Sequence, residues 1–211
     1  MLFRDRIDAG ESLAGLLKEY KGRDIIVYAL PRGGVILGRA IADYLNVPLR
    51  LKFVKKIGHP NNPEYGICAL GEYGELVCND FEIEDLDKEW LNKATVAAED
   101  EIKRQKSIYY NGEATLDPRG KIVILVDDGI ATGLTMAAAI KDIRKANPKE
   151  IIVAIPVVPL DTAKRLKRDC EKLVAVKIES YYLGAVGMYY LDFKEVSDRE
   201  VMEALYGKEG D

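Results

Sequence analysis

Short apolar segments recur along the chain, and segments with the apolar spacing of helices separate them. The apolar segments cover residues 24–30, 49–54, 122–126, 151–157 and 173–178. Nearly continuous apolar strands that alternate with helices are typical of a parallel sheet that is covered on both faces. We therefore expect an α/β fold with a mainly parallel, twisted sheet flanked by helices.

The length of 211 residues favours one domain that spans residues 1–211. Residues 55–118 interrupt the alternation, because they begin with a polar loop at 55–65 and continue with short strands and a long amphipathic helix. We interpret residues 55–118 as a small inserted subdomain, which we call the hood. Residues 181–207 form a C-terminal tail. The hood and the tail are expected to cover the carboxyl ends of the strands.

The charge balance excludes some classes of partner. Lys and Arg total 31 and Asp and Glu total 35, so the formal net charge is −4. This balance provides no general attraction to nucleic acids or anionic membranes. The longest apolar stretch, residues 151–160, contains two prolines and is too short to span a bilayer. The charged N-terminus does not resemble a signal peptide, so we expect a cytoplasmic protein without nucleic-acid or membrane partners.

The cysteines agree with a reducing compartment. Cys68, Cys78 and Cys170 are too few and too irregularly spaced for a disulfide framework or a metal site. A two-residue turn at residues 73–74 would place Cys78 opposite Ala69, with Cys68 on the other face of the strand. We therefore expect no disulfide between Cys68 and Cys78.

Residues 123–135, with the sequence VILVDDGIATGLT, carry the strongest functional signal. A strand ends in two adjacent carboxylates, Asp127 and Asp128, and a turn of small and hydroxyl residues leads into a helix. Ligands of open α/β sheets bind at this end of the strands. Free backbone N–H groups and the helix dipole favour a phosphate there, whereas the carboxylates suit the neutral hydroxyls of a sugar. The segment therefore predicts a phosphate site beside a sugar site.

Two other interpretations of this segment remain open. The carboxylates can be the solvated end of a strand, with a threonine as the cap of the next helix. Alternatively, the domain can be a phosphoacceptor in which Asp127 receives a phosphoryl group. The phosphoacceptor hypothesis explains neither the Thr-Gly-Leu-Thr turn nor the Arg-Gly-Gly sequence that follows the first strand.

Residues 123–135 resemble the phosphoribosyl-pyrophosphate (PRPP) loop of type I phosphoribosyltransferases. Nearly the whole chain resembles a group of predicted phosphoribosyltransferases of bacteria and archaea. The similar segments are residues 3–6, 30–35, 55–58, 62–64, 126–133, 185–187, 192–193 and 197–198. The resemblance implies transfer of a phosphoribosyl group from PRPP to an acceptor, with release of pyrophosphate through an oxocarbenium-like transition state. Members of this family are often dimers, so the resemblance is compatible with a homodimer but does not determine the oligomeric state.

The resemblance implies a role for each matching residue. Asp127 and Asp128 would hold the ribose hydroxyls. The ribose 5-phosphate would lie on residues that we call the PRPP loop: Ile130, Ala131, Thr132, Gly133, Leu134 and Thr135. Leu134 departs from the family pattern, which usually has a small residue there.

A second loop would bind the pyrophosphate. Residues 31–34, which we call the pyrophosphate loop, often contain a non-proline cis peptide in the family. Arg32 can form a fork with pyrophosphate oxygens, and Gly33 and Gly34 allow backbone N–H groups to approach them. Lys56 either reaches the leaving pyrophosphate or is simply solvated. Magnesium would bind mainly through the pyrophosphate, and we expect no metal site built by the protein.

The residue at position 131 bears on the acceptor. Type I enzymes that act on 6-oxopurines usually have an aspartate there, which handles a ring proton of the base, whereas this chain has Ala131. We therefore expect that the acceptor is not a 6-oxopurine. An alternative from another functional class is a sensor that binds PRPP and catalyses nothing. Release of pyrophosphate in the presence of an acceptor would distinguish the two.

Overall fold

The central sheet is parallel and has five strands. The computed structural model describes residues 2–110 and 116–207, and of Glu64 only the backbone. The strand order is β2-β1-β6-β7-β8, and every neighbouring pair is parallel. The strands are β1 (Ile25–Ala29), β2 (Leu49–Leu51), β6 (Ile122–Val126), β7 (Glu150–Pro159) and β8 (Lys172–Glu179). The predicted α/β fold with a parallel sheet is confirmed.

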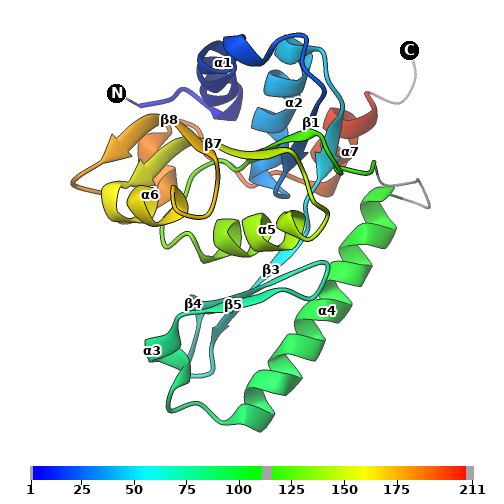
Figure 1. The fold of residues 1–211 in the computed structure, drawn as a ribbon. Coiled ribbons are helices and arrows are strands. Elements are labelled where there is room, and N and C mark those ends of the chain that lie inside the picture. Colours follow the sequence, from blue (N-terminus) through cyan, green and yellow to red (C-terminus); the bar gives the residue numbers. More distant parts are fainter. Residues whose placement is uncertain (1, 111–115, 208–211) are drawn as a thin grey trace.

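Helices cover both faces of this sheet (Figure 1). On one face lie α1 (Arg6–Leu16), which is followed by the short 3₁₀ helix η1 (Lys18–Tyr20), and α2 (Gly33–Leu45). On the other face lie α5 (Leu134–Arg144) and α6 (Leu160–Leu166). Alternate residues of β1 enter different cores, with Val27 in one and Ile26 and Tyr28 in the other. Because β1 and β6 are buried on both sides, their sequences are continuously apolar.

The strand order reverses direction between β1 and β6. The chain passes from β1 through α2 to β2 on one side, and the later strands are added on the other side, beginning with β6. The helices that follow β1 and β6 lie on opposite faces of the sheet (Figure 1). Loops that separate in this way leave a crevice at the carboxyl ends of the strands, which is where open α/β sheets bind ligands.

The hood contains a three-stranded antiparallel sheet and a long helix. Its elements are β3 (Val54–His59), β4 (Asn62–Gly71), β5 (Leu76–Cys78), α3 (Asp80–Ile83) and α4 (Lys88–Tyr110). The prediction of a loop at residues 55–65 is wrong, because most of this segment forms the β3–β4 hairpin. The tip of the hairpin is polar on both faces and therefore lacks the alternation that identifies a strand. Residues 111–115 of the predicted hood lie outside the described residues.

Cys68 and Cys78 form a disulfide, so the expectation of unpaired cysteines is wrong. The two residues are direct partners across β4 and β5. The amide of Gly71 donates to the carbonyl of Glu75, which leaves a three-residue turn with Gly74 at a φ of 83°. A turn that is one residue longer than predicted shifts every pair of facing residues by one position. Cys170 is buried and free.

Helix α5 is covered on two sides, by the sheet and by the hood (Figure 1). Most of its residues are buried, and three consecutive alanines, Ala137 to Ala139, are among them. Small side chains allow β4 to approach closely: a Cβ on Gly71 would lie 2.5 Å from Cγ of Asp142 in α5. Asp142 is itself fully buried, so its charge requires a partner inside the protein.

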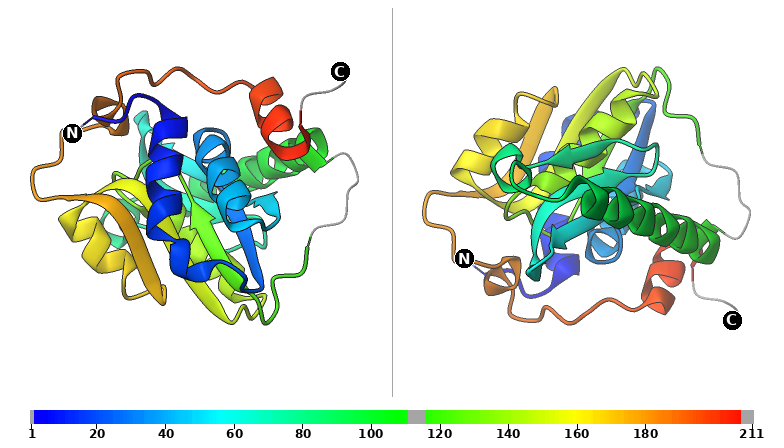
Figure 2. Two further views of the ribbon diagram at one scale, coloured as in Figure 1. Left: turned by 90° about the horizontal axis from the view of Figure 1, so that it is seen from above. Right: turned by 90° about the horizontal axis from the view of Figure 1, so that it is seen from below.

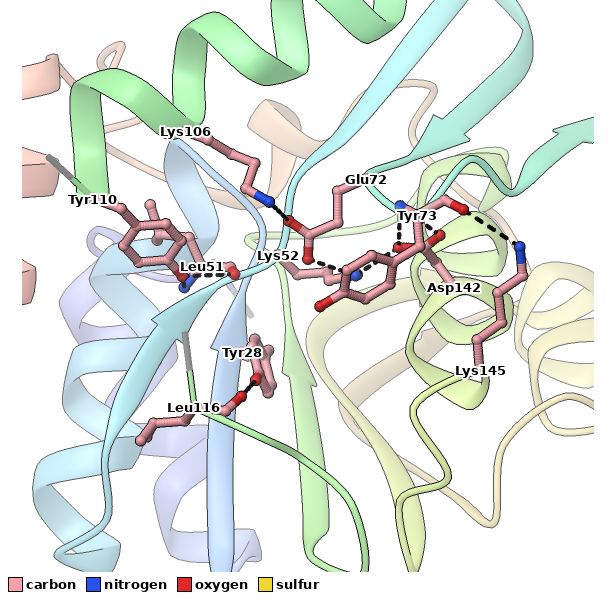
Figure 3. Close-up of polar contacts among 10 residues, drawn as sticks. All are labelled: Tyr28, Leu51, Lys52, Glu72, Tyr73, Lys106, Tyr110, Leu116, Asp142 and Lys145. Atoms are coloured by element: carbon pink, nitrogen blue, oxygen red, sulfur yellow. Dashed lines mark hydrogen bonds and ion pairs between the residues drawn. The ribbon is translucent and has the colours of Figure 1, made fainter. Parts of the chain in front are cut away.

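Lys52 is that partner (Figure 3). Its Nζ lies 2.6 Å from Asp142 Oδ2 and 2.7 Å from Glu72 Oε1, and its side chain is completely buried. The backbone amide of Tyr73 also donates to Asp142, at 3.0 Å, and Lys106 of α4 lies 3.3 Å from Glu72. We call these five residues the Lys52 junction. It connects the end of β2, the β4–β5 turn, α4 and α5, and therefore fixes the hood on the core.

The C-terminal tail runs along one side of the molecule (Figure 2). It contains the 3₁₀ helix η2 (Val186–Tyr189) and ends in α7 (Asp198–Tyr206). The N-terminal segment pairs with it, because Phe3 donates to the carbonyl of Tyr189 and accepts from the amide of Leu191, both at 2.8 Å. The tail therefore passes close to the start of α1.

The Lys52 junction makes a prediction about stability. Replacing Lys52 with Met leaves two buried carboxylates without their shared cation, which should lower the free energy of unfolding by about 3–5 kcal/mol. Urea unfolding measures this loss. As a matched control, Lys93→Met removes an ion pair with Glu89 inside α4, in which both side chains are 75% exposed, and should cost less than about 1 kcal/mol. Equal losses in the two variants would contradict the structural importance of the junction.

Candidate functional site

The acid pair lies where β6 ends, next to the end of β1. The two strand ends are held together by a hydrogen bond of 2.9 Å from the amide of Leu30 to the carbonyl of Val126. Asp127 and Asp128 follow β6 directly in the sequence, and the amide of Asp128 donates to Asp127 Oδ1 at 2.8 Å. The pair therefore stands at the crevice where the strand order reverses.

The pyrophosphate loop is packed directly against this pair. A Cβ on Gly34 would lie 3.0 Å from Cα of Asp127, and a Cβ on Gly33 would overlap the Asp128 carboxylate. Only glycine allows the start of α2 to come this close. The peptide bond between Pro31 and Arg32 is cis, as the resemblance implied.

Arg6 at the start of α1 is a member of the site to which the sequence analysis gave no role. Its Nε donates to Asp128 Oδ2 at 2.8 Å, and the two side chains are only 12% and 16% exposed. The hydroxyl of Tyr190 donates to the carbonyl of Asp128 at 2.6 Å. Arg6 and Asp128 are 122 positions apart, so no local sequence pattern could predict their contact. The one signal was the position of Arg6 within the similar segment 3–6.

Burial and mutual repulsion determine the electrostatics of the acid pair. Burial raises the pKa of Asp127 well above its ordinary value, and the nearby charge of Asp128 raises it further. Burial also raises the pKa of Asp128, while Arg6 opposes this rise. The two neighbours therefore differ, because Asp128 has a cation within hydrogen-bonding distance and Asp127 is the more strongly destabilised as an anion.

The PRPP loop forms the turn between β6 and α5. Two hydrogen bonds anchor the loop. The amide of Ile130 donates to the carbonyl of Val157 at 3.0 Å, and the hydroxyl of Thr162 donates to the carbonyl of Ala131 at 2.9 Å. Gly133 is the N-cap residue of α5 and has a φ of 78°. Because glycine has no side chain, it cannot accept a hydrogen bond from the first amide groups of the helix. The first amide groups of α5 are therefore available to a ligand.

A cavity of about 330 Å³ opens between the hood and this turn. It brings together Asp127, Lys56 and most of the predicted PRPP loop. Its lining consists of Lys56, Tyr65, Gly66, Asp127, Gly129, Ile130, Ala131, Thr132, Gly133, Thr135, Met136 and Val186. The aliphatic part of the Lys56 side chain lies against Gly66. A Cβ on Gly66 would be 2.5 Å from Cδ of Lys56.

Other predicted site residues lie outside this lining. Asp128 is turned toward Arg6, and Gly33 and Gly34 lie behind the acid pair. Leu134 lines a second cavity, of about 510 Å³, between α5, α6 and the hood. The two cavities share Tyr65 and Gly66 of β4 as well as Thr132 and Gly133 of the PRPP loop, so they lie side by side at this loop.

Arg32 points toward the tail. One Nη contacts the carboxylate of Glu195, and the other lies 3.7 Å from Asp198 Oδ1. Its side chain is 38% exposed and that of Glu195 is 81% exposed, so this contact is at the surface. Arg32 is therefore positioned beside the crevice, but its present partners are carboxylates of the tail.

The described residues contain no group of three or more His, Cys, Asp or Glu side chains that could hold a metal ion. In the same part of the chain, no helix is both long and apolar enough to cross a membrane.

The electrostatics of Asp127 predict a stability that depends on pH. A pKa that is raised by folding means that ionised Asp127 opposes folding, and this opposition grows as pH rises through the folded-state pKa. Asp127→Asn removes it, so the variant should have a Tm about 2 °C or more above wild type at pH 8 and a smaller gain at pH 5. Thermal melting at both values measures the difference.

Asp161→Asn provides the matched control, because this side chain is 95% exposed and should leave Tm nearly unchanged at both pH values. A Tm of Asp127→Asn that is equal to or below wild type at pH 8 would contradict the assigned electrostatics.

Comparison with known proteins gives this geometry a context. Residues 5–192 match the family described as the phosphoribosyl transferase domain. Two Mycobacterium tuberculosis proteins, MT0597 and Rv0571c, are named as presumed phosphoribosyl transferases. Each is 34% identical over 206 residues, which is 97% of this chain and 46% of the relative. The chain thus spans less than half the length of these relatives.

Solved structures agree with the match. TT1426 from Thermus thermophilus is 36% identical and superimposes with a TM-score of 0.81, covering 97% of this chain and 98% of its own. AQ2163 from Aquifex aeolicus, at 12% identity and a TM-score of 0.55, covers 96% of this chain and 85% of its own, and shares the fold. The match of the family over residues 5–192 establishes that the chain belongs to the phosphoribosyltransferase family.

Proposed function

We propose that the protein transfers a 5-phosphoribosyl group from PRPP to an acceptor and releases pyrophosphate. The observation that supports this most strongly is the meeting of two loops at the reversal of strand order. One loop carries the acid pair and the free amides of α5, and the other carries Arg32 and two glycines. A ligand with a phosphate, a sugar diol and a pyrophosphate would match these groups in that order.

In this proposal, the residues bind and orient the donor rather than react covalently. The amides and hydroxyls of the PRPP loop bind the 5-phosphate, and Asp127 in the cavity wall accepts hydrogen bonds from the ribose hydroxyls. Charge then develops as the pyrophosphate leaves and the ribose becomes cationic. Fixed groups that stabilise both fragments supply the catalysis.

Arg32 belongs to the pyrophosphate loop, whereas Lys56 belongs to the hood and lines the cavity. Their positive charges can stabilise the departing pyrophosphate. Arg32 would exchange its surface contacts with Glu195 and Asp198 for pyrophosphate oxygens. The high exposure of Glu195 makes this exchange sterically simple.

The residues present are compatible with magnesium that is held mainly by the substrate. The nearby carboxylates are Asp127 and Asp128, and Asp128 is already paired with Arg6. Mg²⁺ prefers six oxygen ligands, so the pyrophosphate, the ribose hydroxyls and water would have to provide most of them. The ion would neutralise the charge on the pyrophosphate.

Release of pyrophosphate from PRPP and Mg²⁺, measured with a panel of nucleobases and small amines, tests the proposed activity. Turnover with any acceptor that is lost in Asp127→Asn supports it. Tight PRPP binding without release under every condition would favour a sensor and overturn the proposed enzyme.

Arg32 gives a prediction about donor binding. Arg32→Met removes a charged donor beside the pyrophosphate, so the Kd for PRPP should rise about 10- to 100-fold. Isothermal titration calorimetry in Mg²⁺ measures this change. Arg199→Met is the control, because Arg199 is 88% exposed and pairs with Glu203 within α7. An unchanged Kd in Arg32→Met would remove Arg32 from the proposed site.

Ala131 leads to a prediction about the acceptor. Its methyl group provides no base for a ring proton, and loss of a positioned general base costs about a hundredfold to ten-thousandfold in rate. Hypoxanthine, guanine and xanthine should therefore be poor acceptors in steady-state assays. The carboxylate of Asp192 in the tail is paired with Lys194 at 2.8 Å. Efficient turnover of hypoxanthine by both wild type and Asp192→Asn would contradict this prediction.

A further inference from the structure

Arg6 connects four parts of the chain at the acid pair. It is the first residue of α1, and its Nε donates to Asp128 at 2.8 Å. Its Nη1 donates to the carbonyl of Lys194 in the tail at 2.6 Å, and its guanidinium lies 3.9 Å from the ring centroid of Phe193. A Cβ on Gly33 of the pyrophosphate loop would lie 2.9 Å from Arg6 Nε.

These contacts hold the guanidinium in one place. The ring of Phe193 covers its face, and the carbonyl and the carboxylate bind its edge, so a planar fork fits where a flexible ammonium would not. The side chain is 12% exposed. Its position is therefore determined by the fold, not by solvent.

The consequence falls on Asp128. Two adjacent carboxylates repel each other, and Arg6 holds the second one away from the cavity that Asp127 lines. Without Arg6, the charge of Asp128 would remain uncompensated directly beside Gly33. A pyrophosphate on that loop would then meet an unpaired negative charge at close range.

We propose that Arg6 is a positioning residue that acts through Asp128: it fixes and neutralises this carboxylate so that the pyrophosphate loop can accept an anion. The inference rests on the proposed function. It separates the two acidic residues by role, with Asp127 directed to the ribose and Asp128 directed to the electrostatic preparation of the pyrophosphate site.

The test uses two ligands that differ only in the pyrophosphate. PRPP and ribose 5-phosphate are titrated calorimetrically, in Mg²⁺, into wild type and Arg6→Met. The Kd for PRPP should rise about 10-fold or more, whereas that for ribose 5-phosphate should change less than about threefold. General damage to the fold would weaken both ligands alike and would overturn the proposal.

A double-mutant cycle tests whether Arg6 acts through Asp128. In an Asp128→Asn background there is no charge to neutralise, so Arg6→Met should change the Kd for PRPP by less than about threefold. Arg4→Met is the matched control: Arg4 is 72% exposed, pairs with Asp8, and should have no effect in either background. An Arg6→Met effect of the same size in both backgrounds would overturn the proposal.

Two further measurements keep the test decisive. If Arg6→Met does not fold, Arg6→Lys replaces it, because it retains the charge but not the fork. It should give an intermediate loss of PRPP affinity that the Asp128→Asn background removes. Persistence of that loss would overturn the inference. Wild type that binds neither ligand would instead refute the proposed function.

Discussion

Parallel pairing of β1 with β6 is the constraint on which the site depends. It joins two strands that are nearly a hundred positions apart in the chain and places the loops after them at one edge of the sheet. One loop carries the acid pair, whose Asp128 is bound by Arg6, and the other carries Arg32. Glycines at the start of α2 then allow contact between the loops at backbone distance. The remaining elements either hold this edge in place or cover it.

The Lys52 junction extends that arrangement to the hood. Helix α5 begins at the PRPP loop and ends beside the junction, and Asp142 near its end is bound by Lys52. The same lysine binds Glu72 of the β4–β5 turn. The hood is therefore aligned on the helix that begins at the candidate phosphate site. Rigid attachment at one end of α5 can position Lys56 and Tyr65 over the cavity at the other end.

Sequence reasoning succeeded where the controlling interactions are local. Strands β1 and β6 of the central sheet could be predicted because burial on both faces makes each one continuously apolar. The β3–β4 hairpin could not, because its tip is polar throughout. The pairing of Cys68 with Cys78 depended on a single residue in a turn. Likewise, the groups of each loop are adjacent in sequence, whereas Arg6 reaches Asp128 only through the tertiary fold.

The contacts of Arg32 with Glu195 and Asp198 have a consequence for any anion that binds there. Such a ligand does not meet a bare cation but displaces a carboxylate of the protein, so its binding is a substitution. The measured affinity is then the difference between two charge-assisted interactions and is smaller than either alone. The displaced carboxylate stays tethered nearby, at a high effective concentration. It is thus available to return to Arg32 as the anion departs, which would shorten the lifetime of the bound product.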